Sequence, residues 1–117
     1  MMSIKFGDAL REFRRAIGMS QRELADRAGL DFSYISKMEN NRIPPPAADT
    51  IVLICKILNI GSEELLSLTG KIPSKMRSDV IANKNAFRFL QEAQEMKLSD
   101  DEWSKLSLSL KKIRKHK

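Results

Sequence analysis

Residues 20–41 read SQRELADRAGLDFSYISKMENN, in which two short helical patterns flank a glycine. Ser20 and Glu23 form the S-x-x-E signature of a helix start, because each side chain can accept a hydrogen bond from an unpaired backbone N–H. Gly29 can adopt a positive φ and turn the chain sharply. Asp31 is a suitable N-cap residue for the helix that follows. The segment therefore predicts two short helices joined by a tight turn.

A turn of this kind serves a particular geometry, the helix-turn-helix. Its two helices cross steeply, so that the second can lie in the major groove of DNA. The crossing requires a small side chain, which Ala25 supplies, and the turn requires a permissive backbone, which Gly29 supplies. The remaining apolar positions are expected to form the shared core, and they are Leu24, Ala28, Leu30, Ile35 and Met38.

The flanking sequence predicts three more helices around this pair. Before it, apolar residues recur at helical spacing from Phe6 to Ile17, and Gly18 ends the pattern. After it, the prolines at 44–46 stiffen a loop, and Pro46 suits the first turn of a helix. That helix buries Ile51, Ile54, Cys55 and Leu58, and a short fifth helix runs from Glu63 to Leu68 before Gly70. Residues 1–70 are thus expected to form one five-helix domain.

Residues 71–117 carry a weaker helical pattern. Residues 71–78, with Pro73, are interpreted as a connector. Ser99 and Glu102 repeat the capping signature before a second helix. Apolar positions at helical spacing predict a first helix through Ala86, Phe89, Leu90, Ala93 and Met96, and a second through Trp103, Leu106, Leu110 and Ile113. No strand pattern occurs, so the predicted fold class is all-α, with five helices followed by about two.

Composition narrows the class of protein. The chain has 117 residues, 42% hydrophobic and 31% charged, which is typical of a soluble globular protein. It has no apolar run near the length of a membrane span and no signal-peptide pattern, so a cytoplasmic protein is expected. One cysteine, Cys55, and one histidine, His116, give neither a disulfide nor a zinc ligand set. Without glycine-rich phosphate loops or nucleophile motifs, neither a cofactor nor enzyme activity is expected.

The net charge of +6 invites a nucleic-acid partner, but its distribution matters more than its size. Residues 1–70 carry nine basic and nine acidic residues, whereas residues 71–117 carry twelve and six. The basic C-terminal tail is most often a solvated end, although some such tails touch phosphates without sequence preference. DNA binding therefore has to be argued from the motif.

The segment at 20–41 resembles the lambda-repressor-like, Cro-type (XRE) family of helix-turn-helix regulators. The likeness continues through PAADTI at 46–51 and EELL at 63–66, so it covers about residues 6–70. Asn41 stands where the family usually has glycine, and the triple proline lengthens the next loop. The resemblance implies a sequence-specific transcription regulator, expected to be a repressor that binds a near-palindromic operator in double-stranded DNA as a homodimer.

The resemblance also implies which residues touch DNA bases. Phe32, Ser33 and Lys37 are expected to face base edges, and Tyr34 and Ser36 to join either the base or the phosphate contacts. The chemistry fits, because Lys donates to guanine O6 and N7, Ser serves either role, and Phe contacts a thymine methyl. Phe32 has an alternative, which is to pack under the loop or at a protein interface.

Other positions are implied as phosphate contacts, which fix register without reading sequence. Gln21 is expected to anchor a phosphate from the start of its helix, with Arg22 beside it among the DNA contacts. Asn40 and Arg42 match further phosphate-contacting positions. Arg14 matches the family's arginine that pairs with Glu39, so a structural role stands beside its predicted DNA contact.

The C-terminal helices leave several uses open. Trp103, Leu106, Leu110 and Ile113 form an apolar seam, which we interpret as a dimerisation surface rather than intramolecular core or a cofactor pocket. In an alternative reading, the chain is an antitoxin-like autoregulator whose C-terminal helices bind a protein partner. A region that senses a ligand is a further possibility. Cys55 is expected to be a buried, inert thiol, and the acidic runs at helix starts are expected to favour the helix dipole.

Overall fold

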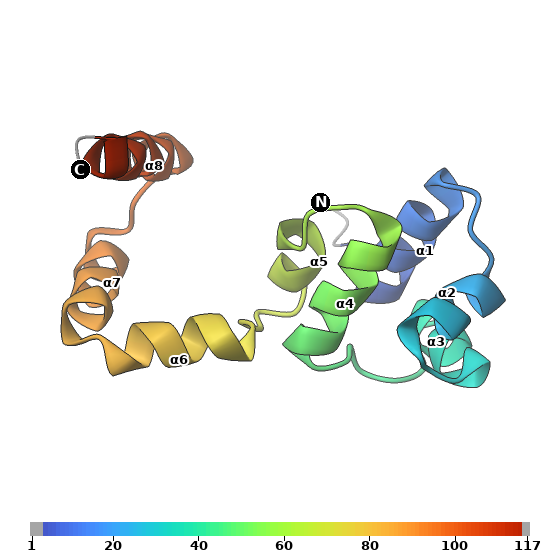
Figure 1. Ribbon diagram of the computed structural model, residues 1–117. Coiled ribbons are helices and arrows are strands. Elements are labelled where there is room, and N and C mark those ends of the chain that lie inside the picture. The colour runs from blue at the N-terminus through green and yellow to red at the C-terminus, as the bar shows by residue number, and fades with distance from the viewer. Residues whose placement is uncertain (1–3, 116–117) are drawn as a thin grey trace. The chain divides into compact units, whose positions relative to one another are not determined.

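The computed structural model describes residues 4–115, which form eight α-helices and no strand (Figure 1). This confirms the predicted all-α fold class. The predicted tail residues His116 and Lys117 lie outside the described part of the chain. The helices are α1 (Phe6–Ala16), α2 (Gln21–Ala28), α3 (Phe32–Glu39), α4 (Ala48–Leu58), α5 (Glu63–Ser67), α6 (Ser74–Ala82), α7 (Lys84–Met96) and α8 (Asp100–Lys115).

The chain divides into two compact units between Arg77 and Ser78. The first unit contains α1 to α5 and the start of α6, and the second contains the rest of α6 with α7 and α8. In the first unit α2 packs on α3 and α4, α1 packs on α3 and α5, and α4 packs on α5. Over residues 4–115, no helix combines the length and the apolar character needed to cross a bilayer.

Each of the helices α1 to α5 contributes at least one fully buried residue to the core of the first unit. Among these residues are Leu10, Leu24, Ile35, Ile51 and Leu65, all with no exposed surface. Burying such a side chain contributes roughly 1.5–3 kcal/mol, so these five residues link the helices to one another. Of the predicted helix-turn-helix core, Leu24, Ala25, Ile35 and Met38 are buried, whereas Ala28 and Leu30 are half-buried.

Local signals set the ends of α2 and the start of α3. The Ser20 hydroxyl accepts a hydrogen bond from the Glu23 backbone N–H at 3.0 Å, as predicted. The Glu23 carboxylate does not complete the predicted box, because it pairs with Arg27 at 3.1 Å. Gly29 has a φ of 68°, and Asp31 occupies the N-cap of α3 without a side-chain hydrogen bond.

The loop between α3 and α4 begins with a left-handed residue and is contacted near its end by a lysine. Asn41, which follows the C-cap residue of α3, has a φ of 58°, in the left-handed region. The Lys71 ammonium donates to the carbonyl oxygens of Pro45 and Pro46 at 3.0 and 2.9 Å. Pro46 precedes the N-cap residue Ala47, so the prediction that it lies in the first turn of the helix was wrong.

The region predicted as a connector, residues 71–78, contains the start of a helix instead. In α6, Ser74 donates its backbone N–H and its hydroxyl to the Asp49 carboxylate. The apolar residues of α6 do not gather on one face of the helix, so no helical period was available from which to predict it. The C-terminal region therefore has three helices rather than two.

The two helices predicted for the second unit are present as α7 and α8. Ser99 and Glu102 form the complete capping box before α8. The Glu102 N–H donates to the Ser99 hydroxyl at 3.2 Å, and the Ser99 N–H donates to the Glu102 carboxylate at 3.0 Å. The sequence thus located this helix start correctly.

Candidate nucleic-acid interface

Helix α3 has one face in the core and an opposite face that is polar and accessible. Ile35 and Met38 are buried. Ser33, Ser36, Lys37 and Asn40 recur at the spacing of one helical face, and three of them are exposed while Ser36 is half-buried. An exposed polar face on the second helix of the pair is the geometry that major-groove recognition requires.

Phe32 lies at the start of α3 and is 39% exposed. The Arg22 guanidinium, from α2, lies over its ring at 4.5 Å from the centroid, which is cation–π distance. Phe32 is therefore not buried under the loop. This pair places an aromatic ring beside a cation, and both groups are chemically able to contact DNA. Their contact with DNA stays a prediction.

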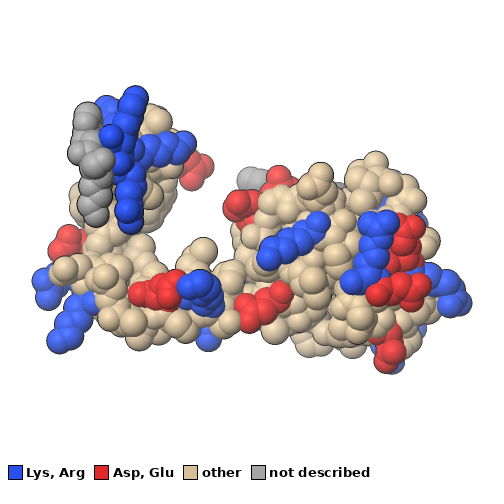
Figure 2. Space-filling view, in the orientation of Figure 1, with Lys and Arg blue, Asp and Glu red and all other residues tan. Residues whose placement is uncertain are grey.

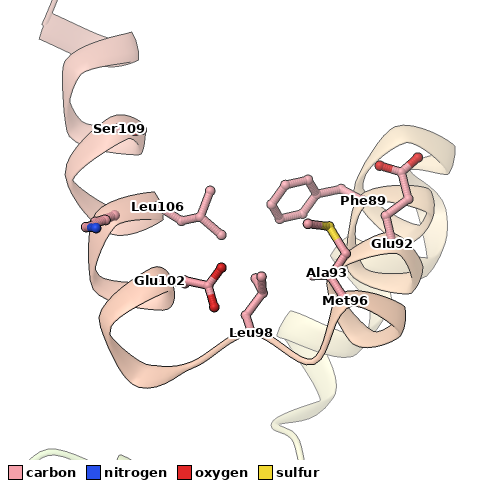
Figure 3. Close-up of a pocket in the computed structure, with 9 residues that line it drawn as sticks. Phe89, Glu92, Ala93, Met96, Leu98, Glu102, Leu106 and Ser109 are labelled. Carbon is pink, nitrogen blue, oxygen red and sulfur yellow. The ribbon is translucent and has the colours of Figure 1, made fainter.

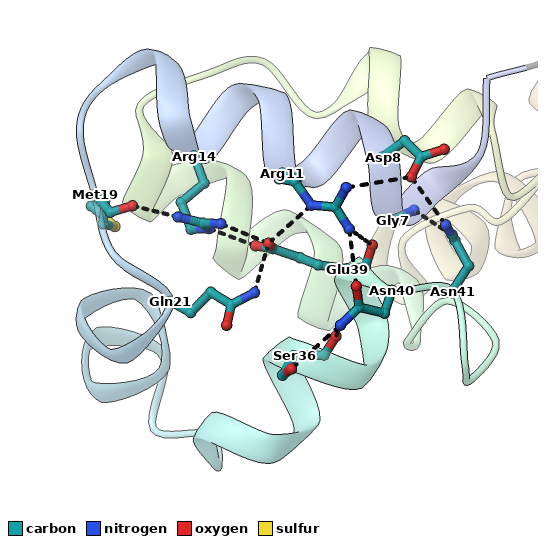
Figure 4. Close-up of polar contacts among 10 residues, drawn as sticks. All are labelled: Gly7, Asp8, Arg11, Arg14, Met19, Gln21, Ser36, Glu39, Asn40 and Asn41. Atoms are coloured by element: carbon teal, nitrogen blue, oxygen red, sulfur yellow. Dashed lines mark hydrogen bonds and ion pairs between the residues drawn. The ribbon is translucent and has the colours of Figure 1, made fainter.

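Arg14 and Glu39 form a buried, two-point ion pair (Figure 4). The Arg14 Nε donates to Glu39 Oε2 at 2.6 Å, and Nη2 donates to Oε1 at 2.7 Å. The remaining Nη1 donates to the Met19 carbonyl at 2.8 Å. The hydrogen bond to Glu39 raises the pKa of Arg14 against the opposing effect of burial. The arginine thus joins α1 to the end of α3, which supports its structural role, and its contact with DNA stays a prediction.

Gln21 contributes to the same cluster from the first residue of α2. Its amide Nε2 donates to Glu39 Oε1 at 2.9 Å, so one carboxylate receives side chains from both α1 and α2. The side chain of Gln21 is half-buried. Its expected phosphate contact therefore has to use hydrogen-bonding groups of Gln21 that are not already bonded to Glu39.

Sequence reasoning missed Arg11 as part of this interface. Its Nη2 donates to the Glu39 carbonyl at 2.7 Å and to Asn40 Oδ1 at 3.2 Å. The Asn40 amide in turn donates to the Ser36 carbonyl at 2.9 Å. Arg11 thereby fixes the last turn of α3 from α1 (Figure 4). Its partner lies 28 positions away, so no local pattern could have identified it.

Sequence reasoning also missed what Asn41 does with its side chain. Its Oδ1 accepts from the Gly7 backbone N–H at 2.9 Å, and its Nδ2 donates to Asp8 at 3.2 Å. The two segments approach so closely that a Cβ at Gly7 would overlap the carbonyl oxygens of α3. The Asn in place of the usual glycine was the available signal, and the structure shows that it ties α3 to α1.

The exposed cations of the predicted interface are Arg22, Lys37 and Arg42. Phosphate contacts of such side chains release counterions and supply most of the non-specific affinity for DNA. Tyr34 is half-buried and packs against the core. Among the residues that the structure describes, no group of three His, Cys, Asp or Glu side chains could hold a metal ion. Burial raises the pKa of the Cys55 thiol, in keeping with an inert cysteine.

The predicted dimerisation seam lies on α8 and remains accessible in the single chain. Trp103 is 43% exposed, Leu110 63% and Ile113 67%, while Leu106 is half-buried. Leu106 faces Phe89 of α7 across an apolar groove (Figure 3). The single chain therefore leaves this seam largely uncovered.

Two short helices around a glycine turn, the second with an accessible polar face, define a helix-turn-helix protein. Residues 10–65 match the HTH_3 family, which is described as a helix-turn-helix. The uncharacterized HTH-type transcriptional regulator RghRB of Bacillus subtilis is 31% identical over 91 residues, which cover 75% of this chain and 66% of RghRB. The chain belongs to the lambda-repressor-like, Cro-type (XRE) family of DNA-binding transcription regulators, which are not enzymes.

Solved structures give the same result. SinR of Bacillus subtilis, in its complex with DNA, matches with 30% identity and a TM-score of 0.50 over 52% of this chain and 97% of that chain. The SinR–SinI complex matches with 22% identity and a TM-score of 0.50 over 96% of this chain and 99% of that one, a likeness of fold alone. The chain spans between 52% and 66% of the length of its curated relatives.

Proposed function

We propose that this chain binds a specific DNA operator by placing α3 in the major groove. The accessible polar face of α3 carries this proposal, because Ser33 and Lys37 are exposed on it and both can hydrogen-bond to base edges. The buried cluster around Glu39 supports it, since Arg14 and Gln21 hold the end of α3 in one orientation. The DNA complex of SinR, which is similar in this part of the chain, favours the same mode.

The proposed binding unit is a homodimer joined through the seam Trp103, Leu106, Leu110 and Ile113. A single short recognition helix reads few bases, and specific operators of this class engage two half-sites about 34 Å apart. Dimerisation would couple the two half-sites and raise the affinity for a near-palindromic sequence. The exposure of the seam in one chain supports this role.

The proposed consequence of binding is repression in the cytoplasm, by occupancy of a promoter against the polymerase. Selection of bound sequences from random duplexes tests the proposal. We expect a recovered motif with two inverted half-sites, whose centres lie about one helical turn apart. Recovery of random sequences alone would contradict specific recognition, and a single half-site would contradict the dimer.

A second candidate is an antitoxin-like autoregulator whose C-terminal helices hold a protein partner. The same exposed seam favours it, because an apolar helix face also fits a foreign helix. Gel filtration of the chain with the product of a neighbouring gene separates the two candidates. Co-elution as a stable complex, with loss of the homodimer, would favour the antitoxin-like function.

A further inference from the structure

The apolar seam of α8 has the spacing of a two-stranded coiled coil. Trp103, Leu106, Leu110 and Ile113 are separated by three, four and three positions, which is the a and d pattern of a heptad. Phe89 of α7 borders the groove along this seam (Figure 3). A second helix laid along α8 would bury the three seam residues that are more than 40% exposed in the single chain.

The charges of α8 are separated along its length. Its first turn carries only acidic charges, on residues 100–102, whereas Lys112, Arg114 and Lys115 lie in its last turn. Basic side chains gather on α8 in the space-filling view (Figure 2). Two parallel copies of this helix would bring like charges together at both ends. Two antiparallel copies would place each acidic end beside a basic end.

From this arrangement we propose that the seam is covered by α8 of a second copy of the chain, running antiparallel to the first. The inference rests on the proposed homodimer and adds its orientation and register. The heptad pattern is symmetric about the level of Leu108. In that register Trp103 lies opposite Ile113 of the second copy, and Leu106 lies opposite Leu110.

This register brings Asp100 beside Arg114 of the second copy, two positions away from the directly opposite one, because both residues flank the seam at the same heptad position. Neither side chain has a hydrogen-bond or ion-pair partner elsewhere in residues 4–115. The neighbouring acids are already engaged. Asp101 pairs with Lys105 at 3.2 Å, and Glu102 accepts from the Ser99 N–H. The two unpaired charges therefore become the determinants of orientation.

Charge reversal in the full-length chain tests the orientation. We expect Asp100→Arg and Arg114→Asp each to weaken self-association about tenfold, because each dimer holds two such pairs and either change turns both into like-charge contacts. The double variant Asp100→Arg/Arg114→Asp restores both attractions in an antiparallel dimer. Sedimentation equilibrium at low salt measures the dimer dissociation constants of the parent, the two single variants and the double variant. Lys112→Glu, on the outer face, serves as the matched control.

Disulfide trapping gives a second, independent readout. Ser107 flanks the seam beside the symmetry level, so an antiparallel pair brings the two copies of Ser107 together, whereas a parallel pair holds them on opposite sides. We expect Ser107→Cys to form a covalent dimer on mild oxidation, and Ser104→Cys, on the outer face, to form none. The natural Cys55 is only 1% exposed and does not interfere.

The outcomes separate this inference from the function on which it rests. Recovery of association in the double charge variant, with cross-linking at position 107 only, supports the antiparallel pair. If the chain dimerises but the double charge variant does not regain association and Ser107→Cys does not cross-link, the antiparallel orientation is overturned and the homodimer itself still stands. A full-length chain that stays monomeric overturns both, while operator selection still tests DNA recognition on its own.

Discussion

Arg14 shows how one buried residue holds the end of α3 in place. Its guanidinium uses all three nitrogens within the protein, two on Glu39 and one on the Met19 carbonyl. The Glu39 carboxylate is completely buried at the end of α3. Removing either partner would leave a buried charge uncompensated, so the stability of the domain and the position of the recognition helix depend on the same pair.

We therefore expect Arg14→Ala to destabilise the chain by about 3 kcal/mol, because breaking a buried ion pair costs roughly 3–5 kcal/mol. Urea denaturation followed by circular dichroism measures the effect. Arg15→Ala is the matched control, since Arg15 is exposed and should change stability by about 0.5 kcal/mol or less. A variant at Arg14 that unfolds together with the parent would show that the arginine acts on DNA alone.

Asn41 offers a separate test, because it combines a backbone conformation with two side-chain contacts. Asn41→Gly keeps the φ of 58° without strain but loses the hydrogen bonds to Gly7 and Asp8, which should cost about 1 kcal/mol. Asn41→Ala loses the same bonds and adds left-handed strain of about 1 kcal/mol. Thermal unfolding should rank the parent above the glycine variant and that above the alanine variant. Equal stability of the parent and the glycine variant would show that the side-chain hydrogen bonds of Asn41 do not stabilise the fold.

At this scale the sequence predicts local chemistry well and distant contacts poorly. Ser20 and Gly29 could be assigned because a helix cap and a sharp turn are decided by neighbouring residues. The contact of Arg11 with Asn40 could not, because it spans 29 positions and depends on how α1 meets α3. The second half of the Ser20 capping box was predicted incorrectly, since Glu23 had a competing partner four residues away, Arg27.

Among the elements, α6 is the helix that the sequence did not reveal. Its apolar residues do not gather on one face of the helix, and its start is fixed by a contact with α4. Helices α7 and α8 were predictable because their apolar residues keep helical spacing even where they remain exposed. Helical spacing of apolar residues thus indicates a helix face that packs against a partner, and α6 has no such face.

The contact that starts α6 should depend on pH. Hydrogen bonds from the Ser74 hydroxyl and backbone N–H lower the pKa of Asp49 below its ordinary value of 3.8. Because the folded pKa is lowered, the contact is intact above that ordinary value and is lost as the pH falls through the lowered one. The Ser74 amide shift in an NMR titration should show a midpoint below 3.8. Ser74→Ala should raise the Asp49 midpoint, and a parent midpoint at or above the ordinary value would contradict the contact.

For the whole molecule, two units share the proposed work, with DNA contacts in the first and association in the second. Lys71 contacts the loop between α3 and α4, and Ser74 contacts α4. The informative truncation therefore falls after Arg77. We expect residues 1–77 to fold and to sediment mainly as a monomer, with operator affinity well below that of the full chain because the half-sites are no longer linked. A truncated chain as dimeric as the parent would place the interface in α1 to α5.

If α3 reads base sequence, substitutions on its exposed face should change base preference, and one set of affinities measures this. The parent, Lys37→Ala, Ser33→Ala and Arg42→Ala are each measured against the selected operator and its single-base variants at one salt concentration. Lys37→Ala should lose about 1–3 kcal/mol of discrimination at one pair of symmetry-related positions. Arg42→Ala should weaken all duplexes alike. Unchanged base preference in both Lys37→Ala and Ser33→Ala would show that α3 does not read base sequence.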